Sequence, residues 1–169
     1  MTNNITTQAA AIRLLILDVD GVLTDGRLLM GDDGAEYKCF HTRDGHGMKQ
    51  LMNSGVEIAI ISGRQSSAVT RRMAELGVAR VAQGQADKQA SYEQLLQELE
   101  LTPNQVAYMG DDSPDLAIMQ QIGLSAAVAD AHELTLNGAD WLASKPGGLG
   151  AVREFCDLLL QAQGNYPTG

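Results

Sequence analysis

Short runs of apolar residues alternate along the chain with segments whose apolar positions recur at the period of a helix. Six runs are short enough to be strands, at 12–17, 56–61, 80–82, 106–109, 124–129 and 140–143. Helices are predicted around 48–52, 68–76, 87–99, 116–122, 133–137 and 149–162, several of them ended by glycine or proline. This alternation is typical of a parallel sheet with crossover helices. The sequence therefore predicts a doubly wound α/β fold.

The limits of the domain follow from the same pattern. We expect a polar N-terminal extension over residues 1–10, one domain over 11–163 and a tail over 164–169. The sequence leaves open whether this tail is disordered or reaches a neighbouring chain. No repeat or linker divides the domain.

One stretch departs from the strand and helix rhythm. Two short segments that are expected to be strands, 28–30 and 35–40, flank a turn of Asp and Gly residues, which is typical of a β-hairpin. This inserted hairpin stands where the first crossover helix is expected. The stretches from Asp20 to Ser62 and from Ser62 to Lys88 are each too short for a second domain, so we expect no cap domain over the sheet.

Composition limits the partners. The 169 residues carry a net charge of −9, with a pI near 4.6, which argues against binding to nucleic acid or to an anionic membrane. One Trp, four Tyr and two Phe leave little for base stacking. No apolar stretch approaches the roughly 18 residues of a membrane-spanning helix. We expect a small-molecule substrate.

The two cysteines and the N-terminus indicate the compartment. Cys39 and Cys156 are too few for a disulfide scaffold, and we expect both to be small buried hydrophobic residues. The first ten residues lack the basic and apolar regions of a secretion signal. The sequence therefore predicts a reduced, cytoplasmic protein.

Polar clusters follow the apolar runs directly. Because the carboxyl ends of parallel strands meet at one edge of a sheet, we expect the clusters to converge on one crevice. An EF-hand is not indicated, because Val22 and Leu23 occupy its fifth and sixth positions, counted from Asp18. The four clusters are Asp18–Gly21, Ser62–Arg64, Lys88 and Gly110–Asp115.

Five carboxylates would meet in that crevice, those of Asp18, Asp20, Asp111, Asp112 and Asp115. Like charges at such close range oppose joint ionisation, and a hard divalent cation removes the conflict. Mg²⁺ prefers oxygen ligands and is commonly held by carboxylates together with phosphate oxygens. The pattern predicts a Mg²⁺ site that takes a phosphorylated substrate, although Asp112 and Asp115 are equally suited to cap the helix after Gly110.

The spacing of the polar residues suggests a division of labour. Asp18, at a strand tip, is placed to act as a nucleophile that forms an aspartyl-phosphate. Asp20 lies on the same side of an extended chain and is placed to protonate the leaving alkoxide and then to deprotonate water. Ser62 and Lys88 supply a neutral donor and a positive charge for the phosphoryl oxygens.

In this order the four clusters resemble the four motifs of the haloacid dehalogenase-like phosphatase superfamily, from about Ile12 onward. The resemblance implies a Rossmann-like fold, with Asp18 as nucleophile and Asp20 as acid and base. The metal would be held by the Asp18 carboxylate, the Asp20 backbone carbonyl and Asp111. Asp112 and Asp115 would support it from nearby. The substrate would contact Asp20, Ser62, Gly63 and Lys88.

A narrower resemblance rests on the hairpin and on residues 40–47 and 145–154. These resemble the phosphatases of 3-deoxy-D-manno-octulosonate 8-phosphate (KDO 8-phosphate), a subfamily that acts in lipopolysaccharide precursor synthesis and forms homotetramers. Relatives cleave 9-phosphates of nine-carbon sialic-type acids, and this alternative stays open. So does a non-catalytic phosphate-binding module, although the presence of both Asp18 and Asp20 speaks against it.

Two residues are candidates for recognising the sugar acid. The Arg64 guanidinium can fork onto a carboxylate, the alternative being a surface arginine. His46 and its flanking glycines can approach substrate hydroxyls, or simply start a helix. Without a cap domain, exclusion of water needs another source. We expect the hairpin to pair with copies of itself in neighbouring subunits, which would wall the crevice.

Overall fold

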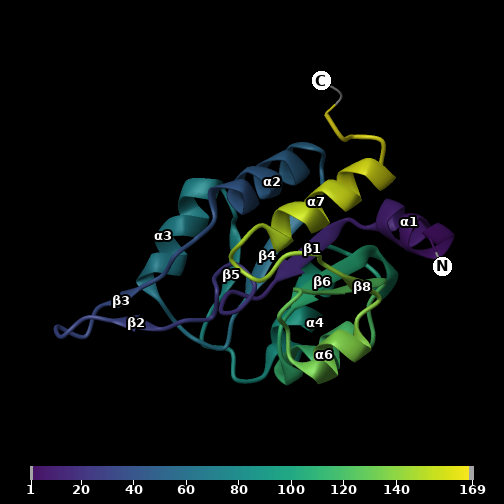
Figure 1. Cartoon of the computed structure of the whole chain (residues 1–169). Helices are drawn as coiled ribbons and strands as arrows, with labels where there is room; N and C mark the ends of the chain where they lie inside the picture. The colour runs from purple at the N-terminus through teal and green to yellow at the C-terminus, as the bar shows by residue number, and fades with distance from the viewer. Residues whose placement is uncertain (1, 168–169) are drawn as a thin grey trace.

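The computed structural model describes residues 2–167, so Met1, the first residue of the predicted extension, and Thr168 and Gly169, the end of the predicted tail, lie outside the described residues. Its centre is a six-stranded sheet in the order β5-β4-β1-β6-β7-β8, and every neighbouring pair of strands is parallel (Figure 1). The strands are β1 (Leu14–Leu17), β4 (Glu57–Ile61), β5 (Arg80–Ala82), β6 (Val106–Gly110), β7 (Leu124–Ala127) and β8 (Trp141–Leu142).

Helices cover both faces of the sheet, which confirms the predicted doubly wound α/β fold. Alternate residues of the central strands enter two apolar clusters: Leu15 and Leu17 pack with the helices on one face, and Leu14 and Ile16 with those on the other. The first cluster takes its helical residues from α1 (Thr2–Ala11), α2 (Thr42–Asn53), α3 (Ser67–Leu76) and α7 (Ala151–Ala162). The second takes them from α4 (Lys88–Glu98) and α5 (Leu116–Met119).

Shorter elements complete the chain. A 3-10 turn, η1 (Pro103–Gln105), precedes β6, and another, η2 (Ser113–Asp115), leads from β6 into α5. Helix α6 (Glu133–Gly138) lies between β7 and β8. In the described part of the chain no helix is both long and apolar enough to cross a membrane.

The predicted hairpin is present as an arm that projects from the body of the molecule (Figure 1). Its strands, β2 (Leu29–Met30) and β3 (Glu36–Tyr37), are antiparallel and shorter than the predicted segments 28–30 and 35–40. The tight turn between them closes with a hydrogen bond from the Gly31 N–H to the Ala35 carbonyl, 2.8 Å. The arm leaves β1 and returns to α2, so it does not interrupt the sheet.

Helix α1 is an element that the sequence pattern did not predict. Residues 2–11 are polar, yet they form a helix that packs against α7 and buries Ala9. The Gln163 side-chain amide donates to the carbonyls of Ala9 (3.2 Å) and Ile12 (2.9 Å), which ties the helix to the end of α7. The helix therefore depends on tertiary contacts rather than on its own apolar pattern.

The prediction for the cysteines is half wrong. Cys156 is buried in the core, but Cys39 is exposed. The reason is local: the preceding residue, Lys38, turns its side chain inward until only 1% of it is exposed, and Cys39 is left at the surface. An isolated apolar residue in a short segment carries no signal for which side it faces.

Candidate active site

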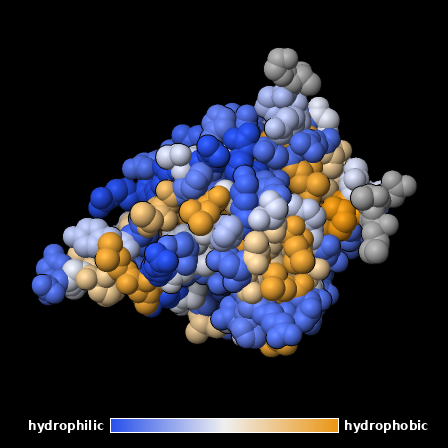
Figure 2. Space-filling model, viewed as in Figure 1, coloured by the Kyte–Doolittle hydropathy of each residue, from blue (hydrophilic) through white to orange (hydrophobic). Residues whose placement is uncertain are grey.

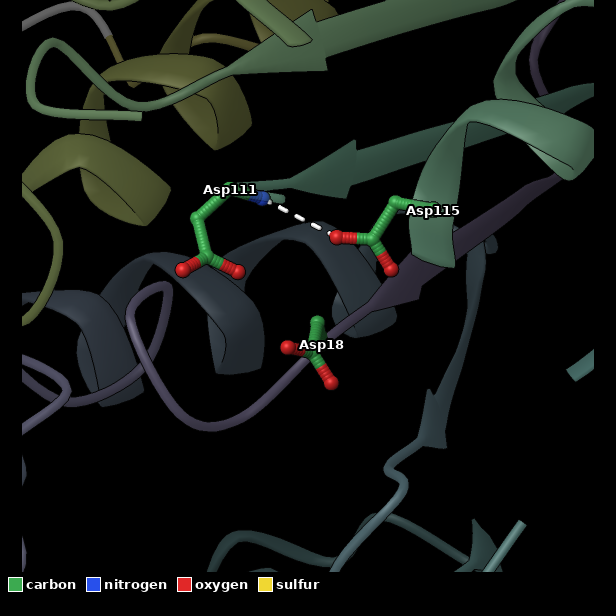
Figure 3. A group of neighbouring side chains, drawn as sticks. All are labelled: Asp18, Asp111 and Asp115. Carbon is green, nitrogen blue, oxygen red and sulfur yellow. Dashed lines mark hydrogen bonds between the residues drawn. The ribbon is translucent and has the colours of Figure 1, made fainter. Parts of the chain in front are cut away.

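The ends of β1 and β6 stand side by side because the two strands pair in register. Leu17 lies opposite Met109, and the Asp18 N–H donates to the Met109 carbonyl at 3.2 Å. Asp18 follows β1 directly, and Asp111 follows β6 directly. Figure 3 shows the side chains of Asp18, Asp111 and Asp115 close together at the ends of these strands. Two loops that are far apart in the sequence thus meet at one edge of the sheet, as expected for a parallel sheet.

One cleft of about 350 Å³ at this edge gathers the predicted site residues. His46 does not line it: this residue is exposed on α2. Its flanking glycines allow close packing of helices instead, since a Cβ at Gly45 would lie 2.5 Å from Arg72, and one at Gly47 would lie 2.8 Å from Arg153. The predicted residues in the cleft are Asp18, Asp20, Ser62, Gly63, Arg64, Lys88, Asp111, Asp112 and Asp115.

Asp115 organises the loop after β6. Its carboxylate is fully buried, and Oδ2 accepts hydrogen bonds from the N–H groups of Asp111 (3.0 Å) and Asp112 (3.3 Å). Oδ1 accepts from Lys88 Nζ (2.7 Å) and from the Tyr108 hydroxyl (2.6 Å). Four donors satisfy the usual capacity of a carboxylate. Asp115 therefore shapes the loop and has little capacity left for a metal ion.

Lys88 joins the two acidic loops. Its ammonium lies 2.9 Å from Asp18 Oδ1, as well as beside Asp115. Burial disfavours the charged ammonium, but the carboxylates of Asp18 and Asp115 outweigh burial and raise the pKa of Lys88. Burial likewise raises the pKa of Asp18, to about 6, although Lys88 opposes the rise. Both groups are charged at neutral pH, which suits a nucleophile beside a fixed cation.

Asp111 provides the test of whether a cation fits here. Burial, followed by the charges of Asp18, Asp115 and Asp112, raises the pKa of its carboxyl to about 8, and no hydrogen bond from a described residue opposes the rise. One carboxylate oxygen each from Asp18, Asp111 and Asp115 lies within 4.8 Å of the others. A hard divalent cation would supply the missing positive charge. The residues fit Mg²⁺, and Asp18 and Asp111 have the capacity to hold it.

Asp20 is held by residues that the sequence reasoning missed. The Lys38 ammonium bonds to Asp20 Oδ1, and Arg64 Nε lies 3.7 Å from Asp20 Oδ2. Glu36 pairs with both cations, at 3.0 Å from Lys38 and 2.5 Å from Arg64. The base of the hairpin therefore reaches the rim of the cleft. In the sequence, Glu36 and Lys38 stand two residues apart in the predicted segment 35–40, where they resemble a solvated charge pair.

Backbone hydrogen bonds fix the loop that carries Ser62. The Ser62 N–H donates to the Ala82 carbonyl at 2.9 Å, and the Gln85 N–H donates to the Ser62 carbonyl at 3.0 Å. The Gly84 N–H donates to the Arg64 carbonyl at 3.1 Å. The loops after β4 and β5 thus hold each other, which places the buried Ser62 at the cleft beside Lys88.

The stretch before α7 braces the loop after β1. We call residues 145–150 the glycine brace. The Gly148 N–H donates to the Val22 carbonyl at 2.9 Å, and a Cβ at Gly147 would lie only 1.7 Å from the Gly21 carbonyl oxygen. Gly21 in turn packs against Asp111: a Cβ at Gly21 would lie 2.0 Å from the Asp111 carboxylate. The brace therefore supports the contact between the two acidic loops.

Comparison with known proteins agrees with this geometry. Residues 76–152 match the model of a family described as haloacid dehalogenase-like hydrolase. The KDO 8-phosphate phosphatase of Salmonella typhi is 49% identical over 97% of this chain and 87% of its own length. That of Escherichia coli K12 is 50% identical over 95% of this chain and 86% of its own length. The chain belongs to the KDO 8-phosphate phosphatase family.

Solved structures of KDO 8-phosphate phosphatases share the fold closely. The crystal structure from Yersinia pestis superposes with a TM-score of 0.95 at 48% identity, covering 96% of this chain and 88% of that one. The structure from Moraxella catarrhalis, a complex with magnesium, phosphate and KDO, has a TM-score of 0.96 at 41% identity. The match covers 98% of this chain and 95% of that one. A magnesium ion in this relative agrees with the fit of Asp18 and Asp111 to a hard cation.

Proposed function

We propose that the chain hydrolyses KDO 8-phosphate to KDO and inorganic phosphate through an aspartyl-phosphate on Asp18. The observation that carries the proposal is the placement of the Asp18 carboxylate at a strand end, 2.9 Å from the Lys88 ammonium and beside Asp111. Relatives that match nearly the whole of this chain and are phosphatases of this substrate support the choice of sugar acid.

The residues divide the reaction between them. A carboxylate oxygen of Asp18 attacks phosphorus, and the bond to the sugar oxygen breaks while that oxygen takes a proton from Asp20. Asp20 then takes a proton from a water molecule, which attacks the phosphorus and frees Asp18 and phosphate. Ser62 donates to the phosphoryl oxygens, and the positive charge of Lys88 offsets their negative charge throughout. Mg²⁺, held by Asp18, Asp111 and the Asp20 backbone carbonyl, neutralises charge on the phosphoryl group when bound.

The rim of the cleft carries the groups proposed to select the sugar acid. Arg64 is half exposed at the mouth, where its guanidinium can reach a carboxylate of the substrate. Asp20 and Glu36 hold it in place until then. His46 lies outside the cleft of its own chain. A role in substrate binding therefore requires that it reach the cleft of a neighbouring chain.

We propose a homotetramer in which hairpins from neighbouring chains pack together and wall the cleft. Four large apolar side chains of the arm are exposed, at 50% for Leu28, 65% for Leu29, 57% for Met30 and 56% for Tyr37. Figure 2 shows apolar surface on the projecting arm at the left. An isolated two-stranded hairpin is only marginally stable, so this arm needs a partner. A second copy is a suitable partner, because a symmetric contact would bury the same apolar side chains of both arms against one another.

The assembly is tested by the mass in solution. Light scattering should give about four times the 18.0 kDa of one chain. Leu29→Asp should dissociate the tetramer, because it buries a charge in the proposed contact. The control, Leu134→Asp, changes another exposed leucine, away from the arm, and should leave the mass unchanged. A monomeric wild-type protein would overturn the proposal.

We also propose a cytoplasmic location. It rests on the two free cysteines, one of them exposed, which suit a reducing compartment. Fractionation should place the protein with cytosolic markers, and recovery with periplasmic markers would contradict the proposal.

The central experiment measures phosphate release from KDO 8-phosphate and from the 9-phosphate of a nine-carbon sialic-type acid. We expect turnover of the eight-carbon ester in Mg²⁺, loss of turnover with a chelator and recovery when Mg²⁺ is restored. Preference for the nine-carbon ester would overturn the substrate but keep the chemistry. Absence of phosphate release from both esters would overturn the proposed function.

A further inference from the structure

Tyr108 sits beneath the active site without facing the cleft. It belongs to β6, is fully buried and packs in the apolar cluster on the α4 side of the sheet. Its hydroxyl donates to Asp115 Oδ1 at 2.6 Å and accepts from Lys88 Nζ at 3.3 Å. The residue is absent from the lining of the cleft, so it does not contact a substrate there. Tyr108 does contact Lys88 and Asp115, which line the cleft.

The hydroxyl completes the coordination of the Lys88 ammonium. An ammonium has three donors on a flexible stem. Here the three acceptors are Asp18 Oδ1 at 2.9 Å, Asp115 Oδ1 at 2.7 Å and the Tyr108 oxygen at 3.3 Å. They come from β6 and from the loops after β1 and β6, so their directions are fixed by the sheet. Removal of one acceptor leaves a buried donor unsatisfied and the ammonium free to tilt.

We propose that Tyr108 is a positioning residue, whose hydroxyl fixes the direction of the Lys88 ammonium and of the Asp115 carboxylate for phosphoryl transfer. The proposal rests on the proposed function, because there the positive charge of Lys88 offsets the charge of the phosphoryl oxygens. Burial also raises the pKa of Tyr108 well above its usual value, so the hydroxyl keeps the proton that it donates to Asp115.

The chain contains a matched control. Tyr92, on α4, is buried in the same apolar cluster, and its hydroxyl has no hydrogen-bond partner among the described residues. Tyr108→Phe and Tyr92→Phe therefore remove the same atom from the same side of the sheet. Only the first removes a contact with Lys88 and Asp115.

The experiment compares kcat and KM of the two variants with those of the wild type. Each enzyme is assayed with KDO 8-phosphate and, separately, with p-nitrophenyl phosphate. We expect Tyr108→Phe to lower kcat about 10–100-fold on both esters while KM changes less than about threefold, the sign of a contact needed mainly in the transition state. Tyr92→Phe should leave both constants unchanged.

A second measurement separates positioning from stability. In a Lys88→Met background, Tyr108→Phe should cost much less activity than in the wild type, because one of the two groups that it positions is gone. The proposal is overturned by an unchanged kcat in Tyr108→Phe, by an equal loss in Tyr92→Phe, by a loss that vanishes when rates are divided by the folded fraction, or by additive losses in the double variant. A wild type active only on p-nitrophenyl phosphate would overturn the sugar-acid substrate and leave the Tyr108 test intact.

Discussion

The Lys88 ammonium lies 2.9 Å from the Asp18 carboxylate, the group placed to attack phosphorus. The same ammonium is the main positive partner of Asp115, which is fully buried. One side chain therefore serves the nucleophile and the fold together. Loss of its charge is expected to affect activity and stability by separate routes.

Lys88→Met keeps the length of the side chain and removes the charge. We expect kcat to fall about 10²–10³-fold, as when one electrostatic donor is removed from a transition state. We expect the free energy of unfolding to fall by about 3–5 kcal/mol, because Asp115 is left as a buried charge without its ion pair. Urea unfolding and steady-state kinetics measure the two effects. The control is Lys49→Met, at an exposed position of α2, and a fully stable Lys88→Met would contradict the account.

Asp18→Asn should lower kcat by about 10⁴-fold or more, because an amide does not act as the nucleophile. The same substitution should raise the stability of the metal-free fold. The folded-state pKa of Asp18, about 6, exceeds the unfolded value of 3.8, so above pH 6 its ionised form weakens the fold when metal is absent. At pH 8 in a chelator the variant should melt at a higher temperature than the wild type. Substantial residual phosphate release would refute the nucleophile assignment.

The raised pKa of Asp111 predicts a pH dependence that Mg²⁺ removes. With a pKa of about 8 in the folded state and 3.8 in the unfolded state, Asp111 binds more proton in the folded chain between these values. The free energy of unfolding of the metal-free protein should therefore decrease as pH rises from about 4 to 8. Saturating Mg²⁺ replaces the proton as positive partner and should flatten the profile. Thermal melts across this range, with and without chelator, measure both curves; parallel curves would contradict a metal at Asp111.

Gly147→Ala should damage the site through the glycine brace. The added Cβ would lie 1.7 Å from the Gly21 carbonyl oxygen, so the loop after β1 must move. We expect a lower melting temperature and weaker apparent Mg²⁺ affinity, since Gly21 contacts Asp111. Gly138→Ala is the control, because its Cβ would meet only the tip of the Leu116 side chain, at 3.0 Å. Wild-type Mg²⁺ dependence in Gly147→Ala would show that the brace does not support the metal site.

Arg64→Ala tests recognition of the sugar acid. The variant should raise KM for KDO 8-phosphate about 10–100-fold, the usual effect of losing a hydrogen bond to a charged group. For p-nitrophenyl phosphate, which has no carboxylate, KM should stay within about threefold of the wild type. Arg71→Ala, on α3 and exposed, is the control. Equal changes in KM for both esters would assign Arg64 to the phosphoryl group instead.

The sequence predicted those parts of the fold and site that depend on local pattern. Buried parallel strands are continuous apolar runs, so the expectation at 106–109 became Val106–Gly110, and the polar cluster after it lies at the cleft. Tyr108 escaped notice because, within such a run, it reads as one more core residue. Lys38 escaped because its contact with Asp20 depends on how the hairpin folds back. Both contacts are tertiary, and no periodicity encodes them.

The hairpin is inserted in the sequence between β1 and α2, and its strands do not pair with those of the main sheet. Changes in its length or side chains therefore alter the approach to the cleft while the strand ends that hold Asp18 and Asp111 stay in register. The arm meets the cleft at its rim, where Lys38 bonds to Asp20 and Glu36 pairs with Arg64. Natural variation can remodel the entrance of such an enzyme without rebuilding its reactive centre.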